Sequence, residues 1–180
     1  MIVYHGSNSN FRKLRIAKEL VKSNSTLLNE GLGIYFSTDR SVAESYGKYV
    51  YTLEINDKYL LDFRKKATCL KYVRSILVVV YKRTNIALNN YIDINSLVEY
   101  MQSGSLAIVG TGKEIIDLLD SNERFYTELS QTKIDTIFRL LRAYDKKHLQ
   151  AYLFPYHIQN IGVIKNINED IVRIINKESQ

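Results

Sequence analysis

The sequence predicts one domain of the α+β class, with strands near both ends of the chain and helices between them. Four of the eight glycines fall within the first 47 residues, among short runs rich in β-forming side chains. From about residue 67 to 144 apolar residues recur at helical spacing, and β-formers return over about 148–165. At 180 residues, 46% of them hydrophobic, the chain is long enough to bury a core.

The N-terminal region combines short strands with one short helix. Apolar and polar residues alternate over 49–55, which is the pattern of a half-buried strand. Thr38 or Asp39 can cap the start of a helix, and Gly47 can end it. The elements expected here are strands over 2–4 and 34–36, a helix from 38 or 39 to about 46, and a strand over 49–55.

The middle of the chain is predicted to be helical and the C-terminal part mainly β. Strands are expected over 149–154 and 158–164, with Pro155 interrupting the first, and a short closing helix is expected around 171–175. The segment 110–113 has glycines and a lysine like a phosphate-binding loop but lacks its spacing, so it predicts a helix start. The residues that set the helical periods are Leu70, Val73, Leu77, Val80, Ile115, Ile116, Leu118, Leu119, Ile134, Ile137, Phe138 and Leu141.

Composition points to a soluble protein of the cytoplasm. The lone Cys69 excludes an intrachain disulfide and fits a reducing compartment. The N-terminus turns polar too soon for a secretory signal, and the most apolar run, 76–81, is too short to span a bilayer. The net charge of +6 comes from scattered cations, which favours a solvated surface over a dedicated nucleic-acid patch. His148 and His157 lie near no cysteine, so no metal site is expected.

The most informative feature is a Tyr-His-Gly-Ser run at 4–7, followed by Gly-Leu-Gly-Ile-Tyr-Phe-Ser at 31–37 and then by Tyr46. His5 directly precedes Gly6, where backbone amides can approach a ligand closely. Tyr35 and Tyr46 are spaced so that they could flank a flat ring. In a chain with 14 tyrosines, spacing alone favours the interpretation that both are ordinary half-buried aromatics.

In this order and spacing the three segments resemble the NAD-binding core of ADP-ribosyltransferases of the diphtheria-toxin and poly(ADP-ribose) polymerase type. The resemblance covers residues 3–55 and implies a pair of packed small β-sheets with a helical insertion. It implies an NAD-binding core of about 1–56, an insertion of about 67–144 and C-terminal strands of about 148–165.

The resemblance also implies roles for individual residues. His5 would bind a ribose hydroxyl of NAD, and the Gly6 backbone would bind the nicotinamide carboxamide. Tyr35 and Tyr46 would stack on the two faces of the nicotinamide ring. The positions that match the family's NAD-binding residues are His5, Gly6, Ser7, Tyr35, Ser37 and Tyr46.

The family's third functional residue is usually a glutamate, and the matching position here is Gln150, giving a His-Tyr-Gln variant. Glutamine can accept a ribose hydrogen bond but brings no negative charge and cannot act as a base. The resemblance therefore implies mono-transfer rather than polymer synthesis, since cleavage needs positioning more than a strong base. Asp145 is the acidic alternative, and Ala43 is a second departure, where the polymerases often place a hydroxyl.

The implied function is an NAD-dependent mono-ADP-ribosyltransferase that releases nicotinamide and passes ADP-ribose to a macromolecule, a protein rather than nucleic acid. NAD would be the co-substrate, with catalysis by His5, Tyr35 and Gln150, no metal and no membrane partner. Three alternatives stay open. They are a non-catalytic NAD- or ADP-ribose-binding module, an NAD glycohydrolase, and a transferase that acts on nucleic acid.

Overall fold

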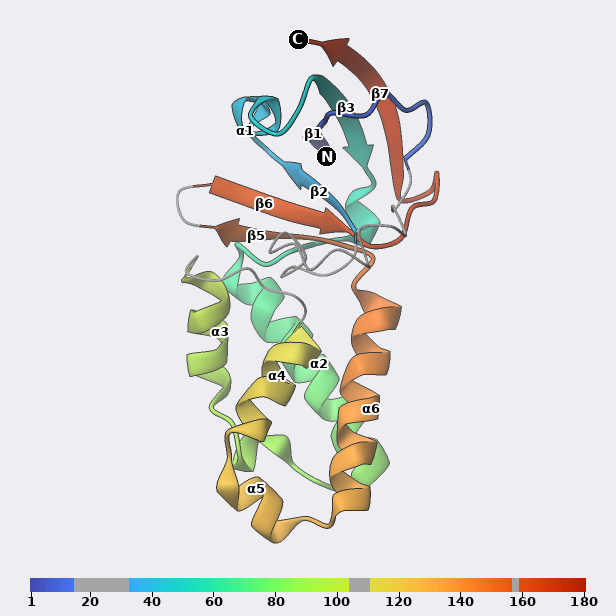
Figure 1. Cartoon of the computed structure of the whole chain (residues 1–180). Coiled ribbons are helices and arrows are strands. Elements are labelled where there is room, and N and C mark those ends of the chain that lie inside the picture. Colours follow the sequence, from blue (N-terminus) through green and yellow to red (C-terminus); the bar gives the residue numbers. More distant parts are fainter. Residues whose placement is uncertain (15–32, 104–110, 157–158) are drawn as a thin grey trace.

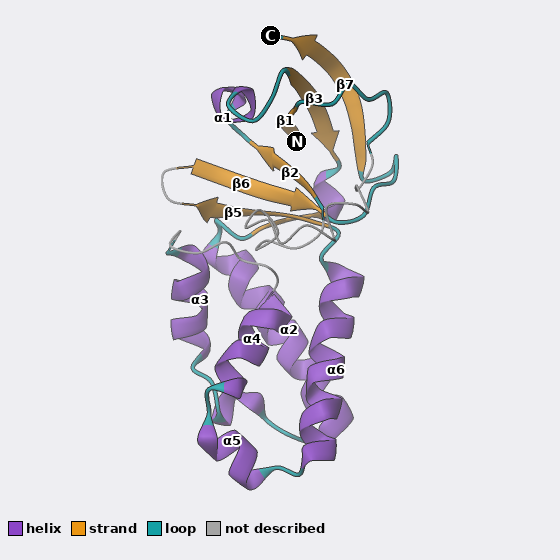
Figure 2. Ribbon diagram, viewed as in Figure 1, coloured by secondary structure: helices purple, strands orange, loops and turns teal. Residues whose placement is uncertain are grey.

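The structure, a computed structural model, describes residues 1–14, 33–103, 111–156 and 159–180. Gly31 and Leu32 of the second motif, together with His157 and Ile158, lie outside these residues. The described chain is a mixed α and β structure with six α-helices and one curled, seven-stranded sheet. Figure 2 shows the strands gathered at one end of the molecule and helices α2 to α6 at the other.

The sheet has the strand order β4-β5-β6-β2-β1-β3-β7. All neighbouring strands are antiparallel except β4 and β5, which run parallel. The bounds of the strands are Ile2–Ser7 (β1), Ile34–Ser37 (β2), Tyr49–Ile55 (β3), Leu60–Asp62 (β4), Ala151–Tyr156 (β5), Gln159–Ile164 (β6) and Val172–Ser179 (β7).

The expected pair of separate small sheets is corrected to one sheet with a weak central seam. β1 pairs with β3 along its whole length, and β2 pairs with β6 along its whole length. Between β1 and β2 the ladder consists of the pair Tyr4 and Ser37. This seam joins the two halves of the sheet, so they are continuous in hydrogen bonding although they curl toward each other.

The helices follow the expected periods, and their ends are set by local side-chain contacts. Asp39 rather than Thr38 caps α1, since its carboxylate accepts the Ser41 amide at 2.9 Å. Asn85 ends α2 in the left-handed conformation, with φ of 57°. The bounds are Arg40–Glu44 (α1), Lys66–Thr84 (α2), Ile94–Gln102 (α3), Thr111–Asp120 (α4), Glu123–Glu128 (α5) and Gln131–His148 (α6), with 3-10 turns at Asp57–Tyr59 and Leu88–Asn90.

Two expectations for the C-terminal part are wrong. The closing helix around 171–175 is strand β7, because pairing with β3 from Tyr49 to Ile55 outweighs the helix-like spacing of three isoleucines. Pro155 does not interrupt β5, which continues to Tyr156. β4 pairs only with residues 151–153 of β5, so the missing Pro155 N–H removes no bond to β4.

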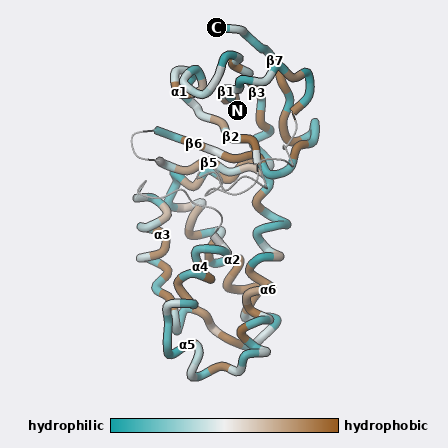
Figure 3. The backbone as a smooth tube through the Cα atoms, in the orientation of Figure 1, coloured by the Kyte–Doolittle hydropathy of each residue, from teal (hydrophilic) through white to brown (hydrophobic). Residues whose placement is uncertain are grey.

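Two hydrophobic clusters form the core on opposite faces of β5 and β6. Tyr152, Phe154 and Val163 belong to the cluster that α2, α3, α4 and α6 cover. Ala151, Leu153 and Ile164 belong to the cluster inside the curl of the sheet. Hydrophobic and hydrophilic stretches alternate along α2, α4 and α6 in Figure 3, as expected for helices with one buried face.

Candidate functional site

The N-terminal motif and the end of α1 meet at Gly6. A Cβ atom at Gly6 would lie 1.9 Å from the Ala43 carbonyl oxygen and 3.0 Å from the Tyr46 Cβ. No side chain fits in that space, so glycine lets the backbone that follows α1 lie directly on β1. Tyr46 stands beside Gly6 as a result, with 55% of its surface exposed.

Gly6, Tyr35 and Ser37 share one face of the strands at the central seam. Residues paired across an antiparallel ladder point to the same face of the sheet. Tyr4 and Ser37 are such a pair, so they lie on one face. Side chains alternate along each strand, which puts Gly6 on the face of Tyr4 and Tyr35 on that of Ser37. The structure therefore brings Gly6, Tyr35 and Tyr46 to the same side of the seam. Tyr35 is partly buried there against the helix-covered cluster.

His5 lies on the opposite face from Gly6, with Tyr51, and its side chain bridges the seam. Its Nδ1 lies 2.6 Å from the carbonyl oxygen of Tyr35, and since that oxygen only accepts, Nδ1 carries the donated hydrogen. Burial lowers the pKa of His5 below its ordinary 6.5, partly offset by this bond. A neutral imidazole with hydrogen on Nδ1 has its lone pair on Nε2, which can accept a hydrogen bond from a hydroxyl.

Two aromatic residues that the sequence did not single out hold the His5 ring in place. The centroids of Phe11 and Tyr51 lie 6.0 and 6.1 Å from that of His5, and the two rings stack on each other at 4.0 Å. The Tyr51 hydroxyl accepts the Phe11 amide and donates to the Ser9 carbonyl, both at 2.9 Å. Tyr51 could have been found from alternation along 49–55, whereas its pairing with His5 is a long-range register.

The two serines of the motif hold turns. Ser37 is 3% exposed; its hydroxyl donates to the Asn160 carbonyl at 3.1 Å and accepts the Asp39 amide at 3.0 Å. It therefore links β2 to β6 and to the start of α1. The Ser7 hydroxyl accepts the Ser9 amide at 3.1 Å, which shapes the turn after β1.

Gln150 lies just before β5, away from the β1–β2 seam. Its Nε2 donates to the Lys147 carbonyl at 2.7 Å, and its Oε1 accepts from Asn166 Nδ2 at 2.6 Å. β6 separates β5 from β2, so two strand spacings, about 10 Å, lie between Gln150 and the strand of Tyr35. The structure thus places the Gln150 carboxamide in a local network and does not bring it into contact with His5 or Tyr35.

Asp145, the acidic alternative, is a partly buried link between α6 and the start of α4. Its two carboxylate oxygens accept the Gly112 amide at 2.9 and 3.1 Å, and one also accepts the Tyr72 hydroxyl at 2.9 Å. Burial raises its pKa, and these bonds oppose the rise. A Cβ at Gly112 would lie 2.7 Å from Asp145 Oδ2, so the glycine is needed for this contact. The described residues 111–113 accordingly form the start of helix α4, which begins at Thr111, and Gly110 lies outside the described residues.

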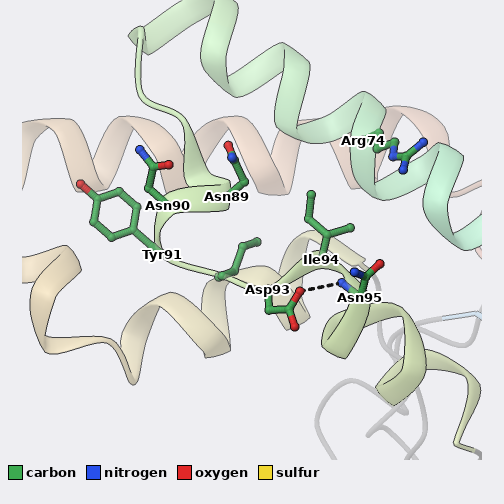
Figure 4. A pocket seen from close by; sticks show the side chains of 8 residues that line it. Arg74, Asn89, Asn90, Tyr91, Asp93, Ile94 and Asn95 are labelled. Carbon is green, nitrogen blue, oxygen red and sulfur yellow. Dashed lines mark hydrogen bonds between the residues drawn. The ribbon is translucent and has the colours of Figure 1, made fainter.

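A separate hollow lies at the other end of the molecule, between α2 and the segment leading into α3. Its volume is about 560 Å³. Figure 4 shows Arg74 reaching toward it from α2, opposite the side chains of the segment 89–95. Its polar lining residues are Arg74, Asn89, Asn90, Tyr91, Asp93 and Asn95.

Comparisons with known proteins give little further information. No protein-family model matches the sequence, and no curated protein is significantly similar to it. One solved structure, described as the crystal structure of an anti-CRISPR protein, is similar at 14% identity and a TM-score of 0.43, over 97% of this chain and 95% of that one.

Among the described helices, none combines the length and the apolar character that a membrane span requires. The described part of the chain holds no group of three or more His, Cys, Asp or Glu residues placed to bind a metal ion.

Proposed function

We propose that the chain is an NAD-dependent mono-ADP-ribosyltransferase that transfers ADP-ribose to a macromolecular acceptor, a protein rather than nucleic acid. The observation that carries the proposal is that Gly6, Tyr35 and Tyr46 lie on one side of the central seam, while His5, on the other face, is hydrogen-bonded across the seam to the Tyr35 carbonyl. These residues come from motifs far apart in the sequence.

The proposed site uses the seam to bind NAD. Only one residue pair joins β1 to β2, so fewer backbone N–H and C=O groups at this seam are used in sheet hydrogen bonds than in a full ladder. Gly6 can therefore offer its backbone to the nicotinamide carboxamide, while Tyr35 and Tyr46 stack on the ring. In its neutral form, His5 can accept a hydrogen bond from a ribose hydroxyl at Nε2.

In the proposed reaction the bond between ribose C1′ and the nicotinamide nitrogen breaks, and the electron pair leaves with nicotinamide. The oxocarbenium-like sugar is then attacked at C1′ by a nucleophile of the acceptor, which loses a proton. Gln150 would orient the reacting ribose through its carbonyl oxygen, giving up its bond from Asn166 to do so. Because glutamine adds no charge and no base, single transfer is favoured over polymer synthesis.

We propose that the activity is cytoplasmic, because the lone Cys69 can form no intrachain disulfide and fits a reducing compartment. Cys69 is buried and its Sγ donates to the Phe63 carbonyl at 3.0 Å. Burial raises the pKa of this thiol to about 11, so it stays protonated at neutral pH.

The proposal is tested by incubating the protein with NAD labelled on its adenylate side in cell lysate, beside Tyr35→Ala. We expect a labelled, nuclease-resistant protein band with the unchanged chain. Nicotinamide release should fall at least tenfold in Tyr35→Ala, since the stacking ring is lost. Tyr100→Ala, which removes an exposed tyrosine of α3, is the matched control and should leave release unchanged. Equal release by the unchanged chain and Tyr35→Ala would refute the stacking role.

A second candidate is a module that binds NAD or ADP-ribose without turnover, favoured by Gln150 in place of a glutamate. In that case calorimetry detects NAD binding that Tyr35→Ala weakens, while neither label nor nicotinamide is released. Release without label would instead indicate a glycohydrolase, and a nuclease-sensitive label a nucleic-acid acceptor.

A further inference from the structure

The outward side of α2 carries an exposed stripe that is both cationic and apolar. Helix α2 holds five Lys or Arg residues and no Asp or Glu. Residues spaced by three or four positions share one face of a helix, and the exposed residues follow this spacing. We call them the α2 face: Lys71, Arg74, Val78, Tyr81 and Lys82.

The apolar part of the α2 face lies between its cations. Val78 is 49% exposed and Tyr81 is 51% exposed, one helical turn apart. The other side of α2 is fully occupied, since Cys69, Val73, Ile76 and Val80 are buried in the helix-covered core. Val78 and Tyr81 therefore lie on the solvent-facing side of α2, while the opposite side of the helix packs in the core.

The cations of the α2 face have no carboxylate partner within the described parts of the chain. Elsewhere on the helices, Lys113 and Arg124 each pair with an acid four residues on. The ion pairs between described residues include none with Lys71, Arg74 or Lys82. The positive charge of this face is therefore available to a partner.

The hollow beside the α2 face extends the same chemistry. Arg74 lines it together with the amides of Asn89 and Asn95. Asp93 is the single carboxylate in the lining, and its oxygens already accept the Asn95 amide at 3.0 Å and the Ser96 hydroxyl at 2.7 Å. Arg74 can thus present a planar, fully charged donor group to an incoming carboxylate.

We propose that the α2 face docks an acidic surface of a protein, namely the acceptor of the proposed ADP-ribose transfer. This inference rests on the proposed function. An apolar centre of Val78 and Tyr81, flanked by Arg74 and lysines, matches the anatomy of protein interfaces, where tyrosine and arginine contribute most to binding. A nucleic-acid surface would instead carry a continuous track of cations along the phosphates.

The first test separates docking from chemistry. The double variant Lys71→Glu/Arg74→Glu is compared with Arg139→Glu/Lys146→Glu, which makes the same charge change on exposed positions of α6. The probe is NAD labelled on its adenylate side: protein labelling is measured in cell lysate, and nicotinamide release, with water as the acceptor, is measured without lysate. We expect the α2 variant to lose at least tenfold in labelling while its nicotinamide release stays within twofold. The α6 variant should keep both. Equal loss of labelling in both variants would overturn the proposal.

The second test does not depend on turnover. If the unchanged chain neither labels a protein nor releases nicotinamide in lysate, the proposed function has failed. Docking is then measured by immobilising the unchanged chain, the α2 variant and the α6 variant and exposing each to lysate. The proposal requires an acidic protein that the unchanged chain and the α6 variant retain and the α2 variant loses. After purification, that protein should bind the α2 variant with a Kd at least tenfold higher than its Kd for the unchanged chain. The proposal would be refuted if the unchanged chain, the α2 variant and the α6 variant retained the same proteins. It would also be refuted if the α2 variant lost a nucleic acid rather than an acidic protein.

Discussion

At the scale of single residues, His5 is the best-defined element of the candidate site. Its Nδ1–H is committed to the Tyr35 carbonyl, and Phe11 and Tyr51 enclose its ring. The Tyr-His-Gly-Ser run predicts that His5 matters, but not that its side chain closes a gap between strands. That role depends on where the β1–β2 ladder stops, a property of the folded sheet rather than of the local sequence.

We predict that His5 makes the protein less stable in mild acid. Its folded pKa is lowered from 6.5, so below pH 6.5 the unfolded chain binds more protons than the native one. Stability is therefore complete above pH 6.5 and declines as the pH falls toward the folded pKa. The slope from this single group is at most about 1.4 kcal/mol per pH unit.

The measurement is urea denaturation at pH 7.5, 6.5 and 5.5 for the unchanged chain and for His5→Gln, in which an amide can still donate to Tyr35. The difference in unfolding free energy between the two proteins should shift with pH in favour of His5→Gln as the pH falls. Parallel pH curves for the two proteins would contradict the buried, neutral His5. The exposed His148 is present in both proteins and cancels in the difference.

At the scale of secondary-structure elements, local patterns predicted most helices and the strands that flank them. Periodicity located α2, α4 and α6, because one face of each is buried. The spacing of isoleucines in 171–175 predicts a helix, whereas the structure has strand β7, because β7 gains its stability from β3, which is more than a hundred residues away in sequence. The contact of Asp145 with Gly112 likewise joins elements that the sequence separates by a long interval.

We predict that Asp145 and Gln150 differ in what they affect. Asp145→Asn should lower the free energy of unfolding by about 1–3 kcal/mol, because one of the two oxygens that accept from Gly112 and Tyr72 becomes an NH2 group that cannot accept. Nicotinamide release per folded molecule should not change. Gln150→Glu should raise nicotinamide release into water, since it restores a charge near the ribose. Chemical denaturation and a release assay on both variants check this, and loss of release in a stable Asp145→Asn would reassign the third residue.

At the scale of the whole molecule, β5 and β6 connect the two hydrophobic clusters. Alternate residues of β5 enter different clusters, with Tyr152 toward the helices and Leu153 toward the curl of the sheet. The sequence predicted the α+β class because that depends on local patterns. It did not predict a single sheet with the order β4-β5-β6-β2-β1-β3-β7, because strand order is set by long-range pairing.

Because the clusters share strands, we predict that the sheet and the helices unfold together. Ile137→Ala, at a fully buried position of α6, should lower the free energy of unfolding by about 2–5 kcal/mol. Helical circular dichroism and the amide NMR signals of β1 and β3 should still report one urea midpoint. Lys133→Ala, an exposed change on the same helix, should alter stability by at most about 0.5 kcal/mol. An earlier midpoint for the helical signal would show that the helices melt independently.

The proline in β5 has a consequence for how this protein behaves at high concentration. Beyond Leu153, the β4 side of β5 has no neighbouring strand within the described sheet, and such an edge can recruit a strand from another molecule. Pro155 lies in that stretch and offers no N–H to an incoming strand. Pro155 removes no hydrogen bond to β4, and its missing N–H makes this edge a poor partner for a strand from another molecule, which disfavours aggregation.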